Sequence, residues 1–234
     1  MRAAFIVTSA INTKFGVFNA EDRLVQTVDT ILSIKQRCPS AYIILVEMAG
    51  VPLQEHQKET LQSHVNLLID YSQDALVQQI YKNPNWDVVK SSTELMCFGE
   101  ALTVMKKHVD SFDRIFKVSG RYLLNDDFNI ADYAGHPSKI VFAKRKKSQF
   151  PPEVTGGVAE QYMSRCWSFP AKDLDKITKM FVAMRKAMFS IVQSGGYIDI
   201  EHLLFLYANQ ADIREVDKIG VQGQLGPNGN LVRD

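Results

Sequence analysis

Short apolar runs alternate with helical periods along the first half of the chain. Residues 3–8, Tyr42–Val46 and Val65–Ile69 are continuous apolar runs of strand length. Residues 21–37 repeat apolar positions with the period of a helix, and residues 53–63 predict a more polar helix. Uniformly apolar strands separated by helices are typical of a parallel sheet that is covered on both faces.

The second half mixes the same two patterns with longer loops. No internal repeat or low-complexity linker divides it, and the glycine-rich tail from Gly220 to Gly229 is typical of turns. We therefore expect one compact α/β domain with a mostly parallel central sheet and a mixed C-terminal part. The further expected elements are strands at 114–118, 139–143 and 163–169, and helices at 92–108, 173–193 and 199–209.

Composition excludes several classes of protein. The 234 residues are 46% hydrophobic, too apolar for a disordered chain, and the formal charge of +1 excludes a strongly basic field for non-specific nucleic-acid binding. No apolar stretch approaches the roughly 18–20 residues of a membrane span, and the first apolar run is too short for a signal peptide. Three scattered cysteines without CxxC spacing disfavour a disulfide framework or a zinc site. We expect a cytoplasmic protein with no membrane span.

Polar residues follow the predicted strands at their carboxyl ends, where open parallel sheets bind ligands. They are Thr8 and Ser9, Glu47, Asp70, and the segment Ser119–Gly120–Arg121. Carboxylates at these positions could accept hydrogen bonds from a nucleobase or a ribose. The alternative is that Glu47 and Asp70 cap helices or turns in solvent.

Two lysines stand in unusual places. Lys90 precedes Ser91 and Ser92, either of which could cap a helix, and a lysine beside a helix N-terminus suits a diphosphate. An ordinary solvated lysine before a capped helix is the alternative. Lys117 lies within an apolar strand, where an unpaired charge is costly. The following Gly120 permits close approach of a ligand, and Arg121 offers a planar fork for phosphate.

The segment before the last predicted helix carries acidic residues. Asp199 is positioned to cap that helix, with Glu201 in its first turn, or either could face the crevice as a general base. Glu201 and His202 are adjacent and do not share a helix face, so the spacing does not predict a carboxylate–histidine pair.

Several familiar motifs are missing from the sequence. It contains no GxxxxGK[ST] loop, no GxGxxG after the first strand, no GxSxG and no HExxH. P-loop nucleotidases, dinucleotide-dependent oxidoreductases, α/β-hydrolases and zinc proteases are therefore disfavoured. The basic cluster Lys144–Lys147 is typical of a solvated edge, although it could meet a phosphate-bearing acceptor.

In order and spacing, these features resemble GT-A-type glycosyltransferases, in particular small glycosyltransferase-like proteins of bacterial surface-polysaccharide loci and large viruses. The segments that carry the resemblance are Ile6–Ala10, Ile44–Glu47, Lys90 with Gly99–Glu100, Phe116–Tyr122, Cys166–Phe169 and Ile200–His202. The resemblance implies a single domain, with residues 1–125 binding a nucleotide-sugar such as a UDP-sugar and residues 126–234 binding the acceptor.

The resemblance also implies roles for single residues. Thr8, Ser9, Glu47 and Asp70 would surround the nucleoside, and Lys90, Lys117, Ser119 and Gly120 would meet the diphosphate. Glu201, or alternatively Asp199, would be the catalytic base, and Arg121 would stabilise the leaving diphosphate.

The segment 119–121 departs from the family, because many of its members hold a divalent metal there with an Asp-x-Asp motif. We expect weak or absent metal dependence, with Mn²⁺ or Mg²⁺ binding at Asp126 or Asp127 as the alternative.

The predicted activity is hexosyl or pentosyl transfer from a nucleotide-sugar to a hydroxyl acceptor, most simply a viral or bacterial glycan. A non-catalytic nucleotide- or glycan-binding module is the main alternative. Transfer to a modified base of nucleic acid, and a metal-dependent nucleotidyltransferase, are weaker ones.

Overall fold

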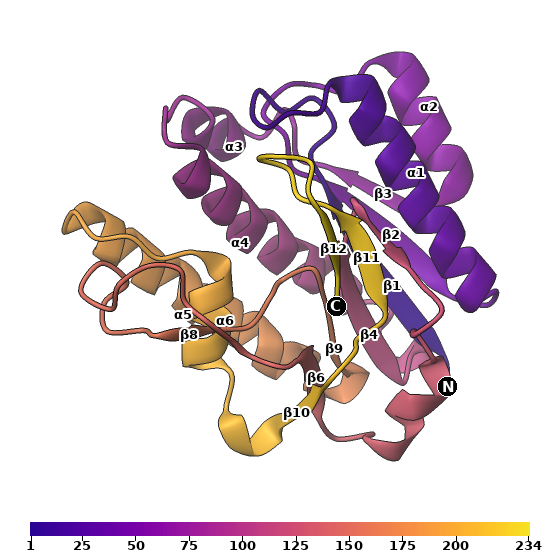
Figure 1. Ribbon diagram of the computed structural model, residues 1–234. Coiled ribbons are helices and arrows are strands. Elements are labelled where there is room, and N and C mark those ends of the chain that lie inside the picture. Colours follow the sequence, from indigo (N-terminus) through magenta and orange to yellow (C-terminus); the bar gives the residue numbers. More distant parts are fainter.

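The computed structural model describes residues 1–234 as an α/β domain around one seven-stranded sheet (Figure 1). The strand order is β10-β6-β9-β4-β1-β2-β3, and β9 alone runs antiparallel to its neighbours. The expected α/β class, with a mostly parallel sheet and a mixed C-terminal part, is confirmed. The strands are β1 (Ala3–Ser9), β2 (Tyr42–Glu47), β3 (Leu67–Asp70), β4 (Arg114–Ser119), β6 (Ile140–Ala143), β9 (Cys166–Pro170) and β10 (Ile213–Val216).

Helices cover both faces of the sheet, as Figure 1 shows. Residues Phe5 and Val7 of β1 pack with residues of α1 and α2, whereas Ala4 and Ile6 pack with residues of α4, α5 and α6. This alternation follows from the two-residue period of a strand and explains why β1 is apolar at every core position. The helices are α1 (Ala20–Arg37), α2 (Glu55–His64), α3 (Ala75–Ile80), α4 (Trp86–Met105), α5 (Leu174–Gln193) and α6 (Ile200–Tyr207).

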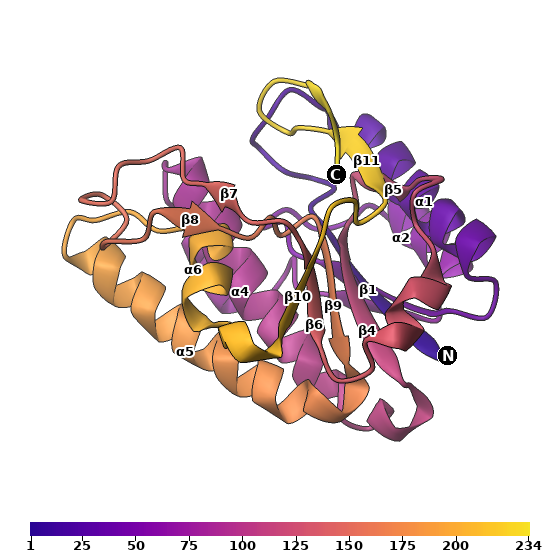
Figure 2. The same ribbon diagram turned by 60° about the horizontal axis from the view of Figure 1, so that its bottom comes forward.

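Two small sheets complete the fold. A two-stranded one joins β7 (Lys146–Lys147) to β8 (Glu160–Gln161). The other contains β5 (Tyr122–Leu124), β11 (Val221–Gln224) and β12 (Leu231–Arg233), in the order β12-β11-β5. We call residues 221–233 the C-terminal hairpin. Figures 1 and 2 show its tip beside the loop that follows β1, and there the Val17 amide donates to the Gly226 carbonyl (3.0 Å).

The main elements lie close to their predicted ranges, apart from the short strands β5, β7 and β8, which were not predicted, and four larger differences. Helix α4 begins at Trp86, several residues before the expected start, because the Asn85 side chain accepts from the Asp87 and Val88 amides. Lys90 therefore lies inside the helix, and the expected cap at Ser91 or Ser92 is wrong. The other differences are α3 and β10, which were not predicted, and the glycine-rich tail, which forms the C-terminal hairpin. None of the helices combines the length and apolar character needed to span a membrane.

Candidate functional site

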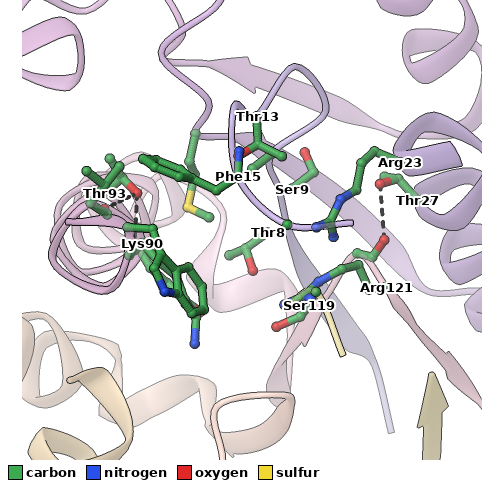
Figure 3. A pocket seen from close by; sticks show the side chains of 18 of the residues that line it. Thr8, Ser9, Thr13, Phe15, Arg23, Thr27, Lys90, Thr93, Ser119 and Arg121 are labelled. Carbon is green, nitrogen blue, oxygen red and sulfur yellow. Dashed lines mark hydrogen bonds between the residues drawn. The ribbon is translucent and has the colours of Figure 1, made fainter. Parts of the chain in front are cut away.

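A cavity opens at the carboxyl ends of β1 and β4, between the loop after β1, the start of α4 and the tip of the C-terminal hairpin (Figure 3). This is the edge at which open parallel sheets bind ligands. The cavity brings together Thr8, Ser9, Lys90, Ser119, Gly120 and Arg121 from the predicted site. It is also lined by Ala10, Thr13, Phe15, Gly16, Arg23, Thr27, Met48, Tyr81, Trp86, Val89, Thr93, Glu94 and Gly226.

The turn after β4 is fixed against β1 and α1. The Gly120 amide donates to the Thr8 carbonyl (2.8 Å), and the Thr27 hydroxyl donates to the Gly120 carbonyl (3.1 Å). A Cβ atom at Gly120 would lie only 3.1 Å from the Thr27 hydroxyl and 3.2 Å from the Thr8 carbonyl oxygen. A residue without a side chain therefore allows this close approach, and the turn places Arg121 in the cavity wall.

Two arginines meet in this wall without an acidic partner. Arg23 of α1 is only 8% exposed, yet its side chain makes no hydrogen bond or ion pair, and its Nε atom is buried without a partner. Arg121 likewise forms no ion pair with a carboxylate. Burial and, secondarily, the neighbouring Arg121 lower the pKa of Arg23 to about 10, so the Arg23 guanidinium group stays charged at neutral pH.

Lys117 is buried beneath the cavity and fully engaged. Its Nζ lies 2.5 Å from Glu94 Oε1 and donates to the Ser164 carbonyl (2.6 Å) and the Ser119 hydroxyl (2.8 Å). Two hydrogen bonds and the ion pair with Glu94 thus commit this ammonium group to partners within the protein. Lys117 is not among the lining residues, and the charge expected to be costly in a strand is neutralised by Glu94 of α4.

Glu201 lies one residue behind the cavity wall. Its Oε1 accepts from the Ser164 hydroxyl (2.6 Å) and lies 3.5 Å from Lys90 Nζ, while its Oε2 is buried without a partner. Lys90 lines the cavity with its side chain about a third exposed (35%), and Glu201 raises the pKa of Lys90. Ser164 thus links the Lys117–Glu94 pair to the Glu201–Lys90 pair.

The charges around the cavity do not cancel. Among the residues that line it, three cations, Arg23, Lys90 and Arg121, stand against one carboxylate, Glu94. Figure 3 shows Lys90 on one side of the cavity and the two arginines on the opposite side. The excess of two positive charges, with both arginines unpaired, is suited to an anion that carries about two negative charges.

Glu47 and Asp70 lie outside the cavity lining. Glu47 is fully buried and accepts from the Ser9 hydroxyl (2.6 Å) and from the Ile11 and Ala49 amides (both 3.0 Å). Burial raises the pKa of Glu47 to about 7. These contacts hold the loops after β1 and β2 in place. Asp70 accepts from the Ser72 amide (2.9 Å), as a turn-capping residue does.

Asp199 caps α6 and contacts a histidine. Its Oδ1 accepts from the His202 amide (3.0 Å) and lies 2.6 Å from His202 Nδ1, and His202 Nε2 lies 2.8 Å from the Ser148 hydroxyl. The carboxylate in this contact is Asp199, three residues before His202 and on the same helix face, and not the adjacent Glu201 to which the sequence-based expectation applied. None of these three residues lines the cavity, and His202 is fully buried.

The residues at the end of β4 do not fit a divalent cation. Asp126 pairs with Arg37, and Asp127 pairs with Lys218 (3.2 Å) and Arg233 (2.7 Å). Glu94, the one carboxylate in the cavity wall, is engaged by Lys117. No three His, Cys, Asp or Glu side chains gather as a metal site needs, whereas two guanidinium groups face the cavity.

The basic cluster at 144–147 is largely neutralised. Lys144 pairs with Asp217, Arg145 with Glu215 (2.8 Å) and Lys146 with Asp234 (2.6 Å). Little unpaired charge remains there for a nucleic-acid backbone.

Sequence reasoning missed Arg23, Glu94 and Gly226. Arg23 and Glu94 each lie in phase with the apolar positions of their helices, four residues before Thr27 and Phe98 respectively. A charged residue in phase with a buried stripe was the available signal. Nothing local distinguishes Gly226 from the other glycines of the tail.

Comparisons with known proteins give little sequence information. No protein-family model matches the chain, and no curated protein matches it in sequence. One solved structure that resembles it is core-mannan synthase A (CmsA/Ktr4) of Aspergillus fumigatus in its Mn/GDP form. The TM-score is 0.48 at 10% identity, over 95% of this chain and 74% of that one. A likeness at this level establishes neither a shared activity nor a shared ligand.

Proposed function

We propose that this protein is a glycosyltransferase that moves a sugar from a nucleotide-sugar to a hydroxyl group of a glycan. The observation that carries the proposal is the excess positive charge of the cavity at the carboxyl edge of the parallel strands. The diphosphate of a nucleotide-sugar carries two negative charges, which matches that excess. The family resemblance of the sequence points to the same activity.

The cavity offers complementary surfaces for the rest of the donor. The hydroxyl groups of Thr8 and Thr13 line the cavity and suit the ribose, and Phe15, Tyr81 and Trp86 provide aromatic surface for the base. Thr8, Arg23, Lys90 and Arg121 all belong to residues 1–125, the half that we assign to the donor. Glu201 belongs to residues 126–234, which we assign to the acceptor.

In the proposed reaction the acceptor oxygen forms a bond to the anomeric carbon, and the bond from that carbon to the diphosphate oxygen breaks. Glu201 takes the acceptor proton at Oε2, its oxygen without a partner, once Lys90 has moved toward the diphosphate and opened the wall in front of it. Lys90 and Arg121 stabilise the charge that develops on the leaving diphosphate. Asp199 is less suited to the role of base, because Tyr197 and His202 already donate to it.

Lys90 couples the two halves in this proposal. It stands between Glu201 and the cavity, and its 3.5 Å contact with Glu201 is long for an ion pair. When the donor diphosphate draws Lys90 away, Glu201 loses its positive neighbour. Its Oε1 atom is then held by the Ser164 hydroxyl alone.

The test is sugar-nucleotide turnover by the wild type, Arg121→Ala and Glu201→Gln, with UDP-, GDP-, CMP- and dTDP-sugars and a panel of glycans. We expect turnover with one donor class, and losses of about 100-fold or more in each variant. The exposed Arg185→Ala variant is the control and should keep wild-type turnover. Undiminished turnover in both site variants would contradict the assigned roles.

A non-catalytic nucleotide- or glycan-binding module is the second candidate. The observation in its favour is that Glu94 and Glu201, the carboxylates nearest the cavity, are only 4% and 5% exposed. Nucleotide-sugar binding without transfer or hydrolysis, for any donor in the panel, would favour the module over the enzyme.

A further inference from the structure

We propose that Arg23 and Arg121 bind the donor diphosphate directly, so that this site binds its nucleotide without a divalent cation. The inference rests on the proposed function, because the diphosphate is that of the proposed donor. It adds Arg23, a residue that the sequence did not indicate, and assigns the source of positive charge at the site.

The first argument is the cost of burying Arg23. A charged group withdrawn from water without a partner is destabilising, and buried charges in proteins are normally paired. Arg23 is only 8% exposed, and its side chain makes no hydrogen bond or ion pair. Its Nε is a buried donor without an acceptor. The guanidinium group lies over the Phe18 ring, 5.3 Å from its centre, and an anionic ligand supplies the hydrogen-bond acceptors and the opposite charge that the protein itself does not provide.

The second argument is the position of Arg121 beside it. Two guanidinium groups without carboxylate partners repel each other, and an anion that contacts both removes this repulsion. The two groups lie close together in Figure 3, on the side of the cavity opposite Lys90. Guanidinium groups also match the geometry of phosphate oxygens through paired N–H donors.

The third argument is that the fold leaves room for this pair at the tip of the C-terminal hairpin. A Cβ atom at Gly226 would lie 2.4 Å from Arg121 Nη1 and 3.1 Å from Arg23 Nη2. The loop after β1 approaches from the other side, where a Cβ at Gly16 would lie 3.1 Å from Arg23 Nη2. The backbone bond from Val17 to Gly226 joins these two segments. The absence of side chains at Gly16 and Gly226 therefore leaves the space that the two guanidinium groups occupy.

The same arrangement opposes a divalent cation. A metal ion at this position would face two positive side chains, and the carboxylate in the cavity wall is already paired with Lys117. The aspartates that follow β4 pair with basic residues elsewhere.

The experiment is calorimetric titration of the full chain with UDP and GDP, in EDTA and again with Mn²⁺. We expect one of the two nucleotides to bind with dissociation constants that agree within about twofold in the two buffers. Arg23→Met should weaken this binding at least tenfold, whereas the exposed control Arg185→Met should not change it. UMP and GMP lack the second phosphate, so the Arg23→Met substitution should weaken their binding much less than it weakens the binding of UDP or GDP.

Thermal unfolding of Arg23→Met without nucleotide separates a binding role from a structural one. Removing an unpartnered buried charge should leave the melting temperature unchanged or raise it. A lower melting temperature would show that Arg23 has partners within the protein and would overturn the inference.

The failure of the inference is distinguishable from the failure of the proposed function. Nucleotide binding that requires Mn²⁺, or that Arg23→Met does not weaken, overturns the inference and leaves the glycosyltransferase proposal standing. Absence of binding by UDP, GDP and all the nucleotide-sugars in both buffers overturns both. Cation-independent binding without sugar transfer supports the inference and contradicts the enzymatic proposal.

Discussion

Two buried arginines at different places in the fold differ in their hydrogen-bond partners. Arg114 begins β4 and is 1% exposed, and Arg23 lies beside the carboxyl end of the same strand and is 8% exposed. Burial lowers the pKa of each to about 10. Arg114 donates to the Ser168 hydroxyl (2.9 Å) and to the His136 and Lys139 carbonyls (2.5 and 3.1 Å), whereas the Arg23 side chain donates to nothing.

The comparison shows that burial and a shifted pKa do not by themselves mark a functional residue. Arg114 has both, and its hydrogen bonds explain it as a structural group that ties β4 to β9 and to the loop before β6. Arg23 has both without those bonds, so its charge remains available. The number of partners, and not the degree of burial, separates a structural arginine from one that is suited to a ligand.

The largest expected effect is a loss of stability when Arg114 is replaced. Replacing it with methionine should reduce the free energy of unfolding by about 4 kcal/mol, because three buried acceptors lose a charged donor. The matched Arg23→Met variant should change it by less than about 0.5 kcal/mol. Urea denaturation of both variants at pH 7 measures the difference. Equal losses in the two variants would remove the distinction.

The same comparison can be made for a buried acid, Glu47. Its titration should change the free energy of unfolding by about 3 kcal/mol. Its pKa in the folded protein is about 7, above the ordinary value of 4.5, because burial favours the neutral form. The stability contributed by its proton is therefore fully present below pH 4.5 and is lost as pH rises to about 7.

Unfolding free energies of the wild type and Glu47→Gln at several pH values test this expectation. The variant lacks the titrating group, so the stability of the wild type relative to it should fall by about 3 kcal/mol between pH 4.5 and 7.5. Parallel pH profiles for the two proteins would show that burial does not raise the pKa of Glu47.

The smallest effect concerns the tip of the C-terminal hairpin. Gly226→Ala should weaken nucleoside diphosphate binding about tenfold, or about 1.4 kcal/mol, by displacing Arg121. It should leave the melting temperature nearly unchanged, because the close atom is the end of a flexible side chain. Gly135→Ala is the matched control, since a Cβ at Gly135 meets nothing within 4 Å. Equal affinities in the two variants would show that the tip does not position Arg121.

The sequence predicted the sheet better than it predicted the cavity. The uniformly apolar β1 and β2 were recognisable as strands buried on both faces. The polar residues at the ends of β1 and β4, Thr8, Ser119 and Arg121, do meet in the cavity wall. The start of α4 was predicted too late because asparagine and serine cap helices equally well, so the local sequence does not distinguish Asn85 from the serines that follow Lys90.

The parts that the sequence did not predict depend on contacts between distant segments. Lys117 was expected to meet a ligand, but Glu94 of another element neutralises it. Arg23 and Gly226 are separated by most of the chain, and only the folded hairpin brings them together. Pattern analysis indicates which face of an element is buried, but not which charge across the interface it meets.

A crystal structure with UDP or GDP bound, grown in Mn²⁺ with a parallel crystal in EDTA, tests the central claim most directly. We predict phosphate oxygens within hydrogen-bond distance of the Arg23 and Arg121 guanidinium groups, at the same place in both crystals and with no metal ion between them. A nucleotide whose phosphates lie away from both arginines, or contact the protein through Mn²⁺, would contradict it.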